Sequence, residues 1–251
     1  MIILISIDTL KLDSLWNIAR KWRAGFDVEI VDSARNQIIS MGEGAVYYVI
    51  TRNITKRDRL GIRAIRDICR KEPEYCGRGI LEALNSKDTI TLKNALFVAG
   101  EVEIPKIGGK LLELLGKQKD GIWISRTLRA LYRSGDSRVC GVLDKYILHP
   151  YEYVRMRSAL LVGQKECRKI KGRLWDMLGD SVFTVRDAAK ISLIKMGFSL
   201  KEFEEKINKI PEHEVMKLLY LSCPSPEYLE IAKKKVRREI FEVWKGYVSC
   251  K

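Results

Sequence analysis

The sequence has few of the side chains from which metal centres and histidine-dependent active sites are built. It contains two histidines, His149 and His213, and six cysteines that form no Cys-x-x-Cys pair and no cluster with histidine. Zinc sites and catalytic triads need several such groups within contact distance of one another. We therefore expect no metal and no cofactor. We expect the cysteines, Cys69 and Cys223 among them, to be buried thiols of a cytoplasmic protein.

Long hydrophobic runs are also absent. No stretch reaches the ~20 apolar residues that span a membrane. The apolar start, residues 1–7, follows no basic stretch and is too short for a targeting signal, so we expect it to pack under the first helices. Residues 108–110 read Gly-Gly-Lys, but Ile104 and Leu111 stand where a phosphate-binding loop needs Gly and Ser or Thr. We predict a soluble protein with no membrane segment and no small-molecule substrate.

An aliphatic residue recurs every 30 to 32 positions along the chain. The recurring residues are Ile30, Leu60, Leu92, Ile124, Val154, Val185 and Val215. Four positions after each of them stands a small or aliphatic residue: Ala34, Ala64, Leu96, Leu128, Ser158, Ala189 and Leu219. This i, i+4 spacing marks one face of a helix, and a period of this length indicates helical units that bury their apolar faces against one another. We predict an all-α superhelix, a solenoid of about seven helix pairs, in a single domain over residues 1–251.

Each unit is expected to contain two helices. The first helices are predicted at 13–24, 45–53, 77–84, 106–115, 137–147, 169–178 and 200–207. Capping signals support the division into helices: Asp88 is a candidate N-cap of a second helix, and Ser199 with Glu202 has the spacing of a capping box. The last helix, predicted at 226–247, is longer and carries an apolar stripe. We expect it to cap the open end of the array.

Nothing in the composition interrupts the array. Proline is scarce, at six residues, and no low-complexity run or linker occurs. The glycines at 100, 135, 163 and 197 stand where units join, as C-caps of helices would require. Three Gln and six Asn accompany 46 basic and 32 acidic residues, a usage that fits a thermophilic source.

The clearest units resemble the HEAT-like repeat family. Residues 174–180 read Leu-Trp-Asp-Met-Leu-Gly-Asp and are followed at 185–189 by Val-Arg-Asp-Ala-Ala, and Val154-Arg155 opens another unit in the same way. In that family a Leu-rich first helix leads through an Asp-containing turn to a second helix that begins Val-Arg and continues with small residues. The resemblance covers most of the chain. It implies a stacked α-solenoid whose second helices line a concave surface, and it specifies fold far better than activity.

Some HEAT-like proteins are alkylpurine DNA glycosylases, with a basic concave face that holds DNA and with Trp and Asp residues at the lesion site. Residues of those types here include Trp123, Trp175-Asp176 and Asp144, although no motif or spacing matches. Trp175 falls within a Leu-rich pattern that favours a place in the core. Trp16 and Trp22 are likewise interpreted as core or cap residues of the first helix.

Charge gives the strongest indication of function. The net charge is +14, and residues 126–251 carry +10 of it. Basic residues one, two, five, six or nine places after the recurring aliphatic residues are expected to face the concave surface. These residues are Arg66, Lys93, Arg126, Arg129, Arg133, Arg155, Arg186 and Lys190. Such a surface attracts polyanions.

The same arginines have a second interpretation. Arg155 and Arg186 occupy the Val-Arg positions of the resemblance, which are often tied to acidic residues in neighbouring turns. We predict a non-enzymatic scaffold that binds an acidic protein or a nucleic acid on its basic concave face. A nucleic-acid-binding or DNA-repair protein is the alternative.

Overall fold

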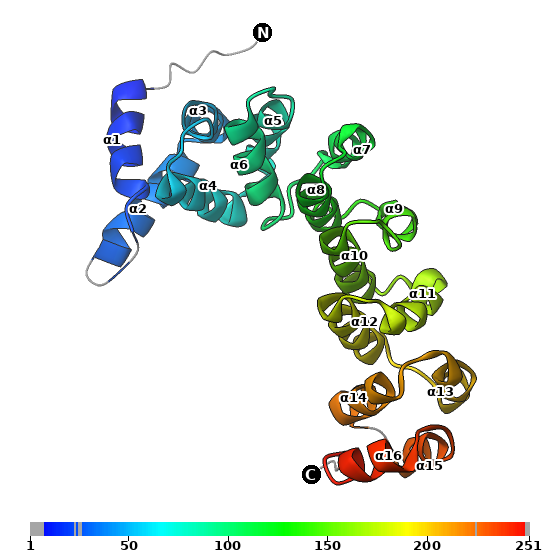
Figure 1. Ribbon diagram of the computed structural model, residues 1–251. Helices are drawn as coiled ribbons and strands as arrows, with labels where there is room; N and C mark the ends of the chain where they lie inside the picture. The colour runs from blue at the N-terminus through cyan, green and yellow to red at the C-terminus, as the bar shows by residue number, and fades with distance from the viewer. Residues whose placement is uncertain (1–7, 23, 25–26, 224, 249–251) are drawn as a thin grey trace. The chain divides into compact units, whose positions relative to one another are not determined.

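The computed structural model describes residues 8–22, 24, 27–223 and 225–248, and this part of the chain is all-α (Figure 1). Of the described residues, 77% are helical and none lies in a strand, which confirms that the fold is all-α. The solenoid of about seven helix pairs stays a prediction. No helix within those ranges is both long enough and apolar enough to cross a membrane. The predicted packing of residues 1–7 concerns positions outside the described residues.

The helices follow the predicted alternation closely. The predicted first helices correspond to α1 (Thr9–Ala19), α3 (Glu43–Asn53), α5 (Pro73–Leu84), α7 (Gly108–Lys117), α9 (Val139–Tyr146), α11 (Lys171–Asp176) and α13 (Leu200–Lys206). The second helices, which carry the recurring aliphatic residues, are α2 (Val28–Ser40), α4 (Arg59–Lys71), α6 (Thr89–Ala99), α8 (Gly121–Arg133), α10 (Glu152–Lys165), α12 (Phe183–Met196) and α14 (Glu212–Ser222). Short 3-10 turns lie at Arg168–Ile170, Met177–Gly179 and Ile207–Lys209. Side-chain caps occur where the sequence signals them: Asp88 accepts from the amide of Thr91, and Ser199 accepts from the amide of Glu202.

The prediction of one long C-terminal helix is wrong. The segment forms two helices, α15 (Pro226–Lys235) and α16 (Arg238–Lys245), separated by extended backbone at Val236 and Arg237. Val236 is buried at this break, and Arg237 donates from its backbone amide and its Nε to the carboxylate of Glu212 in α14, at 3.2 and 2.7 Å. The break lets both short helices pack against α14.

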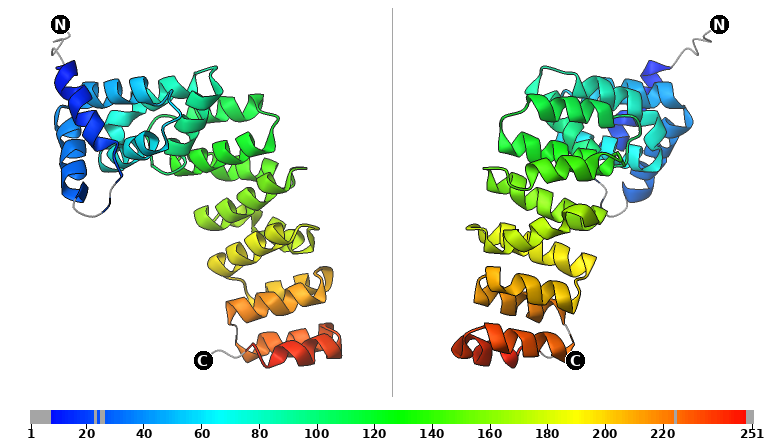
Figure 2. Two further views of the ribbon diagram at one scale, coloured as in Figure 1. Left: turned by 60° about the vertical axis from the view of Figure 1, so that its left-hand side comes forward. Right: turned by 90° about the vertical axis from the view of Figure 1, so that its right-hand side faces the viewer.

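The chain divides into two compact units, Met1–Ser137 and Arg138–Lys251. In the N-terminal unit α2 packs against α4, α4 against α6 and α6 against α8, while α3 packs against α5 (Figure 2). In the C-terminal unit α10 packs against α12 and α12 against α14, with α9 and α11 beside them. Each unit is therefore a series of layers in which a helix contacts the helix two places further along the chain. The prediction of a single domain over 1–251 stays a prediction.

The predicted helix face is the core, with one shift of register. All seven residues that stand four positions after the recurring aliphatic residues are at most 3% exposed. The last four recurring residues, from Ile124 to Val215, are buried as well. Ile30 and Leu60, however, are 57% and 39% exposed, because the buried face of their helices begins one position later, as at Val31. The sequence period is thus correct, but its first members lie at the edge of the buried face.

Two of the four predicted C-cap glycines adopt the expected backbone. Gly135 and Gly197 have positive φ angles of 72° and 67°, which favour glycine at a helix end. Gly163 instead lies inside α10 and is buried, so its assignment as a cap is wrong. A Cβ atom at this position would lie 2.5 Å from the Cβ of Ser192 in α12. Gly163 is therefore required by the close approach of α10 and α12.

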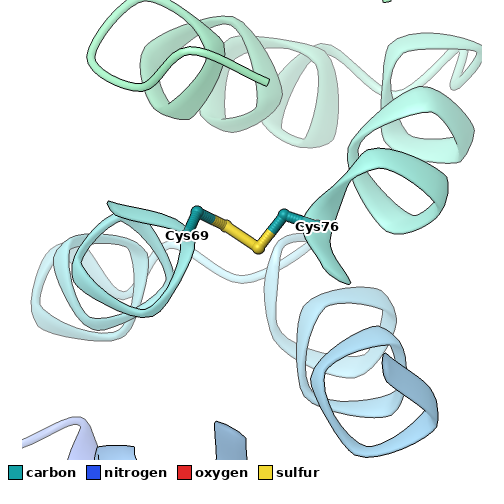
Figure 3. Close-up of a disulfide and its surroundings, with 2 residues drawn as sticks. All are labelled: Cys69 and Cys76. Atoms are coloured by element: carbon teal, nitrogen blue, oxygen red, sulfur yellow. A yellow bond between two sulfur atoms is a disulfide. The ribbon is translucent and has the colours of Figure 1, made fainter. Parts of the chain in front are cut away.

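Two disulfides join helices within the units, which corrects the expectation of buried thiols. Cys69 near the end of α4 is bonded to Cys76 in the first turns of α5, and Figure 3 shows the two side chains meeting between their helices. Their Cα atoms lie 5.7 Å apart because the chain reverses direction at Glu72. Cys140 of α9 is bonded to Cys167, which follows α10. No described cysteine is a free thiol.

Substituting Gly163 tests the close approach of α10 and α12. Gly163→Ala should lower the free energy of unfolding by about 2 kcal/mol or more, because the added methyl group would overlap the side chain and the Cα atom of Ser192. Gly141→Ala is the matched control: it also lies in a helix, and its added Cβ would meet no atom within 4 Å. That variant should gain up to about 1 kcal/mol from helix propensity. Urea denaturation of both variants measures the difference, and equal effects would contradict this packing.

Removing each disulfide should cost stability according to the length of chain that it closes. Cys140 and Cys167 are 27 residues apart, and Cys69 and Cys76 are 7 apart. Loop-closure entropy alone then assigns about 3.5 kcal/mol to the first bond and about 2.4 kcal/mol to the second. Double Cys→Ala variants compared with the parent by chemical denaturation should reproduce this order. If a strong reductant leaves the denaturation midpoint of the parent protein unchanged, the two disulfides are not formed.

Candidate polyanion-binding surface

Arg155, at the start of α10, is fully occupied by contacts within the C-terminal unit. Its Nε and Nη2 donate to the two carboxylate oxygens of Asp180 at 2.7 and 3.0 Å, and its Nη1 donates to the backbone oxygens of His149 and Pro150 at 3.0 and 2.8 Å. The hydrogen bonds to Asp180, together with its negative charge, raise the pKa of Arg155 above its usual value. Burial raises the pKa of Asp180, but the hydrogen bonds from Arg155 and from the amide of Val182, together with the charges of Arg155 and Arg186, outweigh this effect, and the pKa is lowered. Arg155 therefore ties the turn before α10 to the turn before α12.

Arg186 and Lys190, one layer further along, share the buried carboxylate of Glu214 in α14. The Nε of Arg186 donates to Glu214 Oε1 at 2.8 Å, and its Nη1 donates to two backbone oxygens of the turn before α12. The Nζ of Lys190 is paired with the other oxygen of Glu214, and both of these side chains are only 1% exposed. Asp187, a half-exposed residue, also approaches Lys190 at 2.9 Å. The structure thus places Arg155, Arg186 and Lys190 inside the protein's own ion pairs, which fits the second interpretation of their positions.

The stability that this cluster contributes depends on pH through the carboxyl group of Glu214. Burial raises the pKa of its carboxyl group, but the hydrogen bonds from Lys190 and Arg186 and the positive charges of Lys190 and Lys217 together lower it by more, so the pKa lies below its usual value. A carboxylate with a lowered pKa stabilises the folded state above its unfolded pKa of about 4.3. That stabilisation is lost as the pH falls through the folded pKa, because protonation leaves the ammonium of Lys190 buried without its main partner.

In the N-terminal unit, two predicted cations are also tied to carboxylates. Arg129 of α8 donates from its Nε to the backbone oxygen of Gly100 at 2.9 Å and forms an ion pair with Glu101. Arg66 of α4 donates to its neighbour Asp67 at 2.7 Å. Both guanidinium groups retain part of their surface in solvent, so they can add to a positive field although they are not free.

The remaining predicted cations stay available. Lys93 on α6 and Arg133 on α8 are exposed, and Arg126 is half-buried. Arg126 lies over the ring of Trp123 at 5.5 Å, and Arg133 lies over the ring of Tyr132 at 5.8 Å. Such cation–π contacts orient a guanidinium group without neutralising its charge. None of the three is paired with a carboxylate among the described residues.

A hollow of about 360 Å³ lies in the N-terminal unit among residues of α2, α4 and α6 and the segment after α1. Its lining is formed by Lys21, Trp22, Arg35, Leu60, Arg63, Arg66, Asp67, Phe97 and Glu101. Of these, the sequence predicted only Arg66 as a site residue. Phe97 lies five places after Leu92, a spacing already assigned to the concave surface, so including aromatic residues in that rule would have found it. Trp22 could not be found in this way, because α1 ends at Ala19 and leaves Trp22 exposed instead of in a core or cap position.

The two carboxylates of the hollow are shared among several arginines. Asp67 lies 3.0 Å from Arg35 and 2.7 Å from Arg66, and Glu101 lies 3.1 Å from Arg70 and also pairs with Arg129. Arg35 is buried and in addition donates from its Nε to the backbone oxygen of Ala19 at 2.9 Å. Both carboxylates are thus neutralised by arginines of the protein itself, and positive charges outnumber negative charges around the hollow.

Two of the residues compared with DNA glycosylases, Trp175 and Asp144, are held by contacts within the C-terminal unit. Trp175 is buried, and its Nε1 donates to Glu202 at 2.6 Å while its ring packs against Phe198 and Phe203. Asp144 is half-exposed and lies 3.6 Å from the Nε of Arg173. Trp16 belongs to the core. Within the described ranges, no three His, Cys, Asp or Glu residues come together in a way that could hold a metal ion.

Replacing Glu214 tests the buried cluster. Glu214→Gln should lower the free energy of unfolding by about 3–5 kcal/mol, because the charge of Lys190 stays buried and the half-exposed Asp187 compensates it only in part. Adding Lys190→Met to this variant should recover part of the loss. Thermal melts between pH 7 and pH 2 should show a steeper loss of stability below pH 4 in the parent than in Glu214→Gln. Parallel pH profiles would contradict a lowered pKa at Glu214.

No protein-family model matches this chain, and no curated protein sequence matches it. The resemblance to HEAT-like repeats stays a prediction from the repeat pattern of the chain.

Proposed function

We propose that this chain is a HEAT-like α-solenoid that binds a polyanionic partner, without catalysis, on the exposed second-helix surface of its N-terminal unit. We call this surface the basic face and define it by Arg59 and Arg63 of α4, Lys93 of α6, and Arg126 and Arg133 of α8. Support for the solenoid comes from the period of 30 to 32 residues and from the packing of each second helix on the next.

One observation carries the proposal of binding: the cations of the basic face have no carboxylate partner among the described residues. In the C-terminal unit the predicted cations are instead held in ion pairs with Asp180 and Glu214. An exposed cation without an internal partner is surrounded by counterions from solution, and a polyanion that displaces them gains affinity from their release. The basic face can therefore attract nucleic acid or an acidic protein.

A charge-reversal triplet tests the location of the surface. Lys93→Glu, Arg126→Glu and Arg133→Glu together should weaken binding to a 20-base-pair duplex DNA, or to a polyglutamate peptide, at least about tenfold. For DNA, the slope of log K against log salt should also flatten by about one unit for each lost phosphate contact. The fold should persist, because two of the three side chains are exposed, and Arg126, which lies over the ring of Trp123, has no ion-pair partner among the described residues. Fluorescence anisotropy at several salt concentrations measures both quantities.

The matched control changes the same amount of charge elsewhere. Lys233, Lys234 and Lys235 are exposed residues at the end of α15, and their triple replacement by Glu alters the net charge equally. It should leave binding within about twofold of the parent. If both triplets weaken binding equally, net charge is responsible and the basic face is not a site. If the parent binds neither polyanion, the proposed function is wrong.

A further inference from the structure

The hollow beside α4 presents two aromatic side chains to solvent. Trp22 is 57% exposed and Phe97 is 39% exposed, and both line the same cavity of about 360 Å³. Large rings are costly to leave in water, and exposed rings gathered around one cavity are typical of surfaces that bind a ligand. The cavity is within the size range of sites that enclose a small molecule or one unit of a polymer.

The cations around the rings are held in fixed positions. Arg35 and Arg66 are oriented by Asp67, and Arg70 and Arg129 are oriented by Glu101, so two carboxylates serve four guanidinium groups. Asp32, at 3.8 Å from Arg35, adds one more acidic group to this network. The guanidinium groups still outnumber the acids, and Lys21 and Arg63 add two further positive charges to the lining. The hollow therefore offers an ordered positive field to an anion.

Arg63 is a cation that lies directly against one of the exposed aromatic rings. Its guanidinium carbon lies 5.6 Å from the centre of the Trp22 ring, and no carboxylate of the described residues is paired with it. Stacking against the indole leaves the N–H groups at the edge of the guanidinium free to donate to an anion. A planar ring and a phosphate-binding group are thus placed next to each other on an exposed part of the surface.

We propose that this hollow binds one nucleotide of a single-stranded nucleic acid, with its base stacked on Trp22 or Phe97 and its phosphate held by Arg63 and Lys21. The inference rests on the proposed function and narrows its partner. An acidic peptide would satisfy the cations but has no obligatory ring for the aromatic side chains. A duplex would satisfy the cations too, but its bases are stacked inside the helix and cannot reach the hollow.

Two oligonucleotides of equal length and charge separate the contribution of the bases from that of the phosphates. One is a 12-residue oligothymidylate, and the other has the same phosphodiester backbone with abasic residues throughout. The parent protein should bind oligothymidylate about 5- to 100-fold more tightly than the abasic strand, as expected for the stacking of one base. Both strands should show the same salt dependence, because they make the same phosphate contacts.

Replacing the rings should abolish this preference. Trp22→Ala with Phe97→Ala should bring the affinity for oligothymidylate down to that for the abasic strand and leave abasic binding within about twofold of the parent. Trp22→Phe, which keeps a ring, should retain most of the preference. The control Phe183→Ala removes an exposed aromatic residue of α12 and should change nothing. Circular dichroism and melting temperature show whether each variant keeps the fold of the parent.

Three results would overturn the inference. If the parent binds both strands equally, or if the Trp22 and Phe97 variants keep the preference, the hollow takes no base, although the basic face can still bind polyanions. If the parent binds polyglutamate but no oligonucleotide, the partner is an acidic protein and the proposed function survives without the inference. If it binds no polyanion at all, both proposals fail together.

Discussion

The fold depends on arginines that tie one layer of helices to the next. Arg35 with Asp67, Arg129 with Glu101, Arg155 with Asp180 and Arg186 with Glu214 all join residues 25 to 32 positions apart, which is about one repeat. Each of these arginines also donates to at least one backbone oxygen. They fix the distance and rotation between layers in a way that apolar contacts, which have no direction, cannot. The positive charge that remains after these pairings is what the protein can offer to a partner.

The helix order and the core could be predicted from the sequence because both depend on local spacing. Ala189 and Leu128 are core residues because they lie four places after an aliphatic residue on a helix, and no distant information is needed to see this. The role of each basic residue depends instead on carboxylates that stacking brings near. Lys93 and Arg155 each stand one place after a recurring aliphatic residue, yet of the two only Arg155 is paired with a carboxylate among the described residues.

The features that could not be predicted depend on where the chain changes direction. At the break between α15 and α16, Arg237 donates to the carboxylate of Glu212, a contact across 25 residues that no local pattern contains. Cys69 and Cys76 come within bonding distance because α4 and α5 are joined by Glu72 alone. Trp22 is exposed because α1 stops three residues earlier than Trp22. In each case the position of the residues depends on a turn of a few residues. Hydrophobic patterns extend over whole helices and do not predict the geometry of such turns.

The Cys69–Cys76 disulfide limits how the N-terminal unit can open. In stacked helical proteins, local unfolding usually starts at helix ends, where few contacts must be broken, and spreads by whole helices. This bond joins the last turn of α4 to the beginning of α5, so the end of α4 cannot fray while α5 stays folded. Arg70 lies in that last turn and Asp67 directly precedes it, and the two side chains organise one side of the hollow. The arrangement of the hollow is therefore lost only when α4 and α5 unfold together, which is a rarer event than the fraying of one helix end.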